Sequence, residues 1–148
     1  MALNFNQFAV EANEFLKDYT KELCLDGDTE QAGRILSAIL HGLREIISKD
    51  ESLQLIAQFP MFLKAVYVNG WTSHKKRKVK NMVDFIDLLR EFNGATSVHD
   101  FKSNEVAESY IHSTFIMLRR YISLGELEDI RTELPKDLKF MVYDNIMF

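Results

Sequence analysis

The sequence predicts an all-α fold, a compact helical bundle of two pseudo-equivalent four-helix halves. Three observations predict it. Only 6 glycines and 2 prolines occur in 148 residues, fewer than a turn-rich β fold needs. Apolar residues recur at three- and four-residue intervals along most of the chain, which is the period of an amphipathic helix. The chain also resembles itself at an offset of 75 residues, which indicates a duplicated unit.

The repeat aligns residues 32–70 with 107–145 without a gap and gives nine identical pairs in 39 positions. Unrelated segments of this length would share about two or three. The identities include Ser48 with Ser123, Glu51 with Glu126 and Pro60 with Pro135. We therefore predict a first helical repeat at 1–71, a basic connector at 72–80 and a second repeat at 81–148, with the two repeats packed as one domain.

In the first half, a helix is expected to begin after Asn4 and to bury one apolar face. The second helix should begin after Asp28, which can cap it, and end near Ser48. The apolar face of the first helix comprises Phe5, Phe8, Ala9, Ala12, Phe15, Leu16 and Tyr19.

Two Ser-x-x-Glu segments, beginning at Ser48 and Ser123, have the form of a capping box and each predict the start of a new helix. Proline fits the first turn of a helix, so Pro60 and Pro135 should each open the last helix of a half. In the first half that helix should stop at Gly70. In the second half we expect helices at about 81–92, 104–122, 124–133 and 135–147, with a loop at 93–102.

Composition limits the possible classes of protein. The chain has 18 basic and 22 acidic residues and no apolar run long enough to span a membrane. Glu11 and Glu14 interrupt the region where a signal peptide would be apolar, and the lone Cys24 excludes an internal disulfide. A cytoplasmic protein without a membrane span is expected.

Several motifs together resemble a known family. They are Gln58-Phe59-Pro60 followed by Leu63-Lys64, the pair Gly70-Trp71 that closes the first half, and Leu134-Pro135-Lys136-Asp137-Leu138 near the C-terminus. Their order and spacing resemble the bacterial domain-of-unknown-function family numbered 2267, small cytosolic proteins with two such halves. The resemblance covers essentially the whole chain and implies an all-α bundle. That family has no assigned activity, so no catalytic residues are carried over.

The residues that could support catalysis or metal binding are scattered. His41 and His112 lie on equivalent helices but not at equivalent positions, and the four histidines form no metal-binding spacing. Cys24 lies beside acidic Asp26, which disfavours a reactive thiolate. Carboxylates in the segment 126–133 alternate with apolar residues and are expected to face solvent. We therefore predict no catalytic residues, no metal site and no cofactor.

The connector is the most unusual segment, because it holds five of the 18 basic residues. Such a run can bind phosphate backbones or anionic lipid, or it can be a solvated linker, which is the favoured interpretation. No aromatic residue within the run could stack on a base, and the rest of the chain is strongly acidic, so nucleic acid is the less favoured partner. The basic residues are Lys75, Lys76, Arg77, Lys78 and Lys80.

Two further groups are candidates. Arg44 and Arg119 occupy matched places near the ends of the long helices, where a cation complements the helix dipole, and a role in binding an anion is the alternative. Phe62, Tyr67 and Trp71 form an aromatic group beside the connector, either as core or as a partner surface.

The sequence thus favours a non-enzymatic interaction or scaffold protein. It would bind an unidentified protein partner, or a second copy of itself, near Phe62, Tyr67, Trp71 and the connector. The first alternative is a polyanion-binding protein, with nucleic acid or anionic lipid bound by the connector. The second is a small anionic ligand held between the halves near Arg44 or Arg119.

Overall fold

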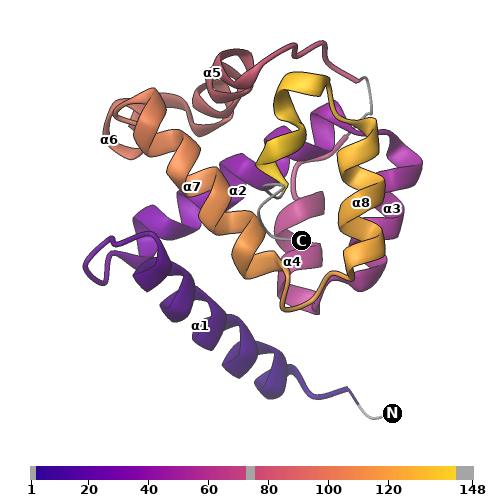
Figure 1. Cartoon of the computed structure of the whole chain (residues 1–148). Coiled ribbons are helices and arrows are strands. Elements are labelled where there is room, and N and C mark those ends of the chain that lie inside the picture. The colour runs from indigo at the N-terminus through magenta and orange to yellow at the C-terminus, as the bar shows by residue number, and fades with distance from the viewer. Residues whose placement is uncertain (1–2, 73–75, 143–148) are drawn as a thin grey trace.

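A computed structural model describes residues 3–72 and 76–142. Every regular element in these ranges is helical, as the sequence predicts, and the helices pack into a compact bundle (Figure 1). The first half contains α1 (Phe5–Glu22), α2 (Thr29–Ile46), α3 (Lys49–Gln58) and α4 (Met61–Val68). The second contains α5 (Met82–Asn93), η1 (Gly94–Thr96), α6 (Ser97–Asp100), α7 (Asn104–Leu118), α8 (Leu124–Glu133) and η2 (Lys136–Met141).

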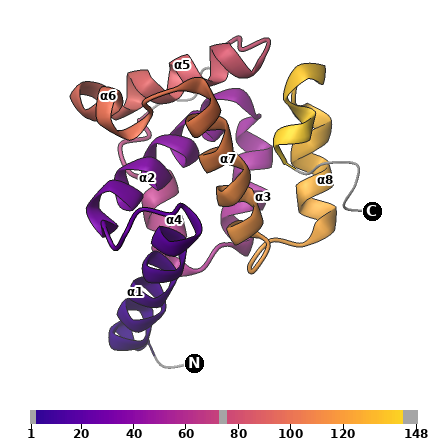
Figure 2. The ribbon, with the colours of Figure 1, turned by 60° about the vertical axis from the view of Figure 1, so that its left-hand side comes forward.

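The core forms around α2, which contacts α1, α4, α5, α6 and α7 (Figures 1 and 2). Its approach to α5 is close enough to require glycine. A Cβ atom on Gly42 would lie 2.5 Å from Leu89 Cδ2 and 3.3 Å from a ring carbon of Phe85. The absence of a side chain at Gly42 therefore lets α2 and α5 pack closely.

The contacts between elements come in pairs related by the sequence repeat. α1 packs on α2 as α5 packs on α7, and α2 packs on α5 as α7 packs on α1. α3 and α8, which are equivalent in the repeat, contact each other. Two halves related by a local two-fold axis would produce this reciprocal pattern. The proposed boundaries at 71 and 81 stay a prediction.

Only part of α1 is buried, contrary to the expectation from its apolar face. Phe15 and Tyr19 are in the core, and the hydroxyl of Tyr19 is 2.6 Å from that of Thr114 on α7. Phe5 is 72% exposed. The N-terminal half of the helix extends away from the bundle (Figures 1 and 2), because an 18-residue helix is about 27 Å long and its neighbours cover only its C-terminal part.

Three boundaries in the second half differ from the sequence prediction. α7 ends at Leu118 instead of near 122, and the last element is a 3₁₀ helix, with residues 143–148 outside the described part of the chain. The segment 93–102 is not a plain loop but contains η1 and α6. Buried Asp100 accepts hydrogen bonds from Arg34 on α2, at 2.8 and 2.9 Å, and this tertiary contact orders the segment.

In the described ranges, none of the helices combines the length and the apolar character needed to cross a membrane.

Candidate functional site

The described part of the connector, from Lys76 to Lys80, lies against the bundle. The backbone N–H of Arg77 donates to the carbonyl of Glu45 at 2.7 Å, and its guanidinium donates to the Glu91 carboxylate at 2.9 and 3.2 Å. Val79 is only 9% exposed, and the backbone N–H of Lys80 donates to Asp84 at 3.2 Å. The basic side chains of the described connector are exposed to solvent, but these contacts hold its backbone against the bundle.

A pocket of about 640 Å³ lies between this part of the connector, which we call the strap (residues 76–80), and the corner that joins α8 to η2 (residues 133–137). Its size is typical of a site for a small ligand or a few side chains of a partner. Apolar groups come from the end of α2, from Val79 and from the corner, and basic groups come from both sides. The lining residues are Ile46, Lys76, Arg77, Lys78, Val79, Lys80, Glu133, Leu134, Pro135, Lys136 and Asp137.

The charge of this pocket is positive, since five basic side chains line it against two acidic ones. Arg77 is paired with Glu91, which raises the pKa of the arginine and lowers that of the carboxyl. Within the described residues, the exposed lysines of the pocket lie in no ion pair. They are Lys76, Lys78, Lys80 and Lys136, and their charges are available to a ligand.

Sequence reasoning found the connector side of the pocket and missed the other side. Lys75 lies outside the described residues, and the remaining four candidates of the connector line the pocket. Lys136 was missed because a single lysine after a helix-opening proline carries no distinguishing pattern. Its position opposite the connector depends on how η2 folds back over the end of α2.

The paired arginines lie elsewhere, and neither lines the pocket. Arg44 is buried, and its Nη1 donates to the carbonyls of Tyr67 at 2.7 Å and Asn69 at 2.8 Å. It therefore stabilises the C-terminal end of α4, not that of its own helix as the sequence suggested. Arg119 is the half-buried C-cap residue of α7. A direct role for buried Arg44 in holding a ligand between the halves has no support from this geometry.

The aromatic group does not form one exposed surface. Tyr67 is fully buried and its hydroxyl is 2.7 Å from that of Ser52, so it belongs to the core. Phe62 is half-buried against the rings of Phe15 and Tyr121. Trp71 is half-buried and meets Tyr67 edge-on. A partner could reach parts of Phe62 and Trp71, but not the three residues together.

A second hollow, of about 540 Å³, lies beside α2 and is lined in part by Arg34 and His41. Three of its polar side chains, those of Arg34, His41 and Asn93, already have partners. Arg34 is held by Asp100, and a ring nitrogen of His41 lies 2.8 Å from the carbonyl oxygen of Val66. Burial lowers the pKa of His41, so this histidine is a neutral structural residue near pH 7. The hollow offers a ligand little that is unpaired.

The two capping boxes are formed differently from the sequence prediction. Each serine does cap its helix, since Ser48 Oγ and Ser123 Oγ accept from the backbone N–H three residues on, both at 3.1 Å. The glutamates do not return to the serine N–H groups. Glu133 at the end of α8 binds the N–H of Ser48 at 2.6 Å, and Gln58 at the end of α3 binds that of Ser123 at 2.8 Å. Each helix thus caps the start of the other.

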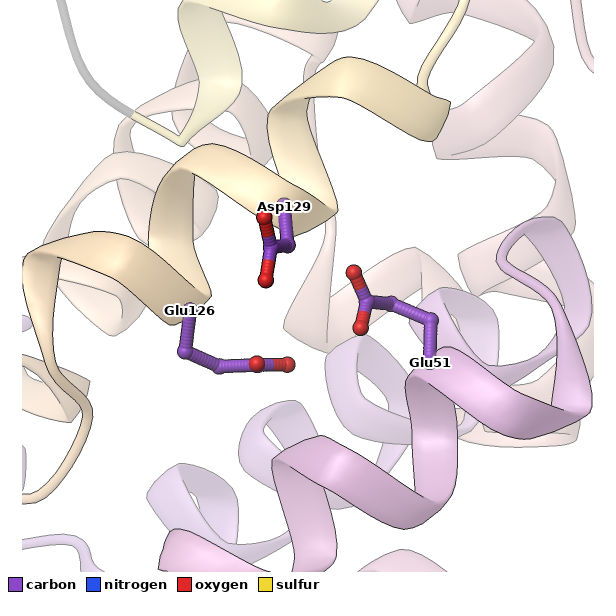
Figure 3. A group of neighbouring side chains, drawn as sticks. All are labelled: Glu51, Glu126 and Asp129. Atoms are coloured by element: carbon purple, nitrogen blue, oxygen red, sulfur yellow. The ribbon is translucent and has the colours of Figure 1, made fainter.

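Glu51 and Glu126, the glutamates of the two Ser-x-x-Glu segments, lie close together at the contact between α3 and α8. Glu51 and Glu126 are 5% and 4% exposed, and with Asp129 they place one oxygen each within 4.8 Å of one another (Figure 3). Burial, with the Glu51 carboxylate next in importance, raises the pKa of Glu126 to about 7. Burial also raises the pKa of Glu51, with Glu133 and Asp129 contributing. The expectation that the carboxylates of segment 126–133 all face solvent is therefore wrong for Glu126.

Among curated proteins, none matches this chain. A family model does match, that of DUF2267, which is described as an uncharacterized conserved protein and aligns with residues 12–141. The matched region extends from α1 to the last residue of η2 and includes the connector and both sides of the pocket. The chain therefore belongs to the DUF2267 family.

Proposed function

We propose that this chain is a non-enzymatic, cytoplasmic interaction protein, and that it binds an acidic segment of a partner protein in the pocket between the connector and the α8–η2 corner. The supporting observation is the combination of an apolar floor with lysines that have no described ion pair. Pro135 offers apolar surface beside the buried Ile46, Val79 and Leu134, and exposed Lys76, Lys78 and Lys136 offer charge. A segment with acidic side chains beside one or two apolar ones is complementary to both.

A polyanion fits this site less well. Arg77 is occupied by Glu91, and Glu133 and Asp137 lie on the pocket lining, where they would repel a phosphate backbone. The apolar floor would also remain unused. These contacts favour a partner that presents few charges at defined positions over one that presents a uniform row.

Selection from a random peptide library displayed on phage tests the proposal. We expect wild-type protein to enrich peptides that combine Asp or Glu with apolar residues. The charge-reversed variant K76E/K78E/K136E should lose them, with at least a tenfold weaker affinity for the selected peptides in fluorescence anisotropy. The matched control K17E/K21E/K102E changes the same number of exposed lysines outside the pocket and should bind like wild type.

Equal binding to both triple variants would show that the pocket is not the site. Selection of peptides without acidic residues would contradict the charge argument. If instead only nucleic acid bound, with an affinity that falls steeply as salt is added, the polyanion alternative would replace the proposal.

A small anionic ligand with an apolar body is the second candidate, and the volume of about 640 Å³ favours it. The apolar anion 8-anilinonaphthalene-1-sulfonate serves as its probe. We expect its fluorescence to rise on binding to folded wild-type protein and to rise much less with K76E/K78E/K136E. An equal rise with both proteins would exclude this candidate.

A further inference from the structure

Three carboxylates converge where α3 contacts α8. Glu51 extends from α3, and Glu126 and Asp129 extend from successive turns of α8 toward the same small volume (Figure 3). The first two are buried, and Asp129 is exposed. Like charges so close together repel strongly in a region shielded from water, so a compensating positive charge would stabilise the cluster.

No such charge comes from the described residues. None of the ion pairs between described side chains includes Glu51, Glu126 or Asp129. The charged groups that act on Glu126 are themselves carboxylates, namely Glu51, Asp129 and Glu133. The backbone N–H groups of Ser48 and Ser123, which the two glutamates of the capping boxes could have accepted from, donate to Glu133 and Gln58 instead. Within residues 3–72 and 76–142, these glutamates thus have no cationic partner in an ion pair.

A separate observation indicates a missing ligand. Oxygen Oε1 of Glu126 is shielded from solvent and has no hydrogen-bond partner among the described residues, in a residue that is only 4% exposed. A buried carboxylate oxygen without a partner is costly, and native structures rarely keep one without a water, an ion or a function.

We propose that Glu51, Glu126 and Asp129 form a binding site for a hard divalent cation, with Ca²⁺ preferred. Hard divalent cations choose oxygen ligands, and three carboxylates supply more than enough negative charge. The three oxygens lie within 4.8 Å of one another, close enough for one ion to bind all three. Ca²⁺ is preferred because it accepts irregular sets of carboxylate oxygens, whereas Mg²⁺ demands near-ideal octahedral geometry and keeps several waters.

Exposed Asp129 marks the open side of the site, where water would complete the coordination. The bound ion would join α3 of the first half to α8 of the second. It lies apart from the pocket, because none of the three ligands lines it. A negative result for the cation site would therefore leave the proposed function unaffected, and the reverse also holds.

Isothermal titration of Ca²⁺ into the full-length chain, in a non-chelating buffer at pH 8, tests the site. We expect one saturable Ca²⁺ per chain, with Mg²⁺ binding more weakly. E126Q and E51Q should each bind Ca²⁺ at least about tenfold more weakly, while keeping the helical circular dichroism of wild type. The control E128Q alters an exposed carboxylate on the same helix and should bind like wild type.

Mn²⁺ provides a second readout, because its free ion has a strong electron paramagnetic resonance signal. Wild-type protein should quench that signal, added Ca²⁺ should restore it, and E126Q should quench it less. Folded wild-type protein that binds neither ion at millimolar concentration would overturn the proposal. So would E126Q that binds Ca²⁺ as tightly as wild type.

Discussion

The buried carboxyl of Glu126 makes a specific prediction for stability as a function of pH in the absence of divalent cations. Its pKa is raised from the ordinary value of 4.5 to about 7 in the folded chain. Below pH 4.5 the group is protonated in both the folded and the unfolded state and contributes no pH dependence. Between pH 4.5 and 7 the folded chain retains a proton that the unfolded chain releases, so stability falls as pH rises.

The size of this effect follows from the difference between the two pKa values. A difference between about 7 and 4.5 corresponds to a loss of about 3 kcal/mol across the window. Glu126 is only 4% exposed and interacts with Glu51, whose pKa is raised as well, so the loss belongs to the pair of carboxyls. A typical domain has about 5–15 kcal/mol of stability in all, so the loss is large enough to measure.

Substitution of Glu126 by glutamine isolates the contribution of this group. The protonated carboxyl of Glu126 shares a side-chain hydrogen bond with Glu51, and the amide of glutamine can donate a similar bond but cannot ionise. We expect E126Q to equal wild type near pH 4 and to exceed it by about 2–3 kcal/mol at pH 8. Urea denaturation followed by circular dichroism, with a chelator present, measures the difference.

The control is E128Q, since Glu128 lies on the same helix and is exposed. It should follow the wild-type pH dependence. If E126Q and wild type lose stability in parallel between pH 4.5 and 8, the carboxyl of Glu126 is not the group that titrates, and the reasoning from its burial is wrong.

Four further substitutions test the packing. G42A should lower the free energy of unfolding by about 1–3 kcal/mol, because its Cβ would lie 2.5 Å from Leu89, whereas G33A meets no atom within 4 Å and should gain about 0.5–1 kcal/mol in urea denaturation. R44M should cost about 2–4 kcal/mol, since it leaves two carbonyls at the end of α4 without their donor, and no loss of melting temperature would contradict that role. D100N should destabilise the segment 94–100 and increase its amide hydrogen exchange, because the bidentate pair with Arg34 is lost; unchanged exchange would show that other contacts order it.

The helix starts were predictable because a cap is a local interaction. Asp28, Ser48 and Ser123 each accept from a backbone N–H three residues on, as the spacing indicates. Helix ends were less predictable. α7 stops at Leu118 although its apolar pattern continues toward Ile122, and the turn that follows is held in part by Gln58 at the end of α3, which accepts from the N–H of Ser123 at 2.8 Å.

The candidate sites depended more strongly on tertiary contacts. The connector was recognisable from its charge, but a charge pattern cannot distinguish a solvated segment from one that packs against the bundle. Burial of Val79 and the bond from Arg77 to Glu45 hold the strap over the pocket. Tyr67 and Trp71 were recognisable as aromatic, yet only the position of α4 relative to α2 shows that Tyr67 belongs to the core.

By itself, the sequence determined the helical class, the family and the main helix-starting residues, because each of these depends on interactions within a few residues or on comparison of motifs. The internal repeat stays a prediction. The sequence also contained the equivalence of Glu51 and Glu126. Only the tertiary structure decided that these two residues meet. Each looks like a solvated residue of an amphipathic helix until the equivalent helix of the other half covers it, and burial against a distant segment leaves no trace in the local pattern.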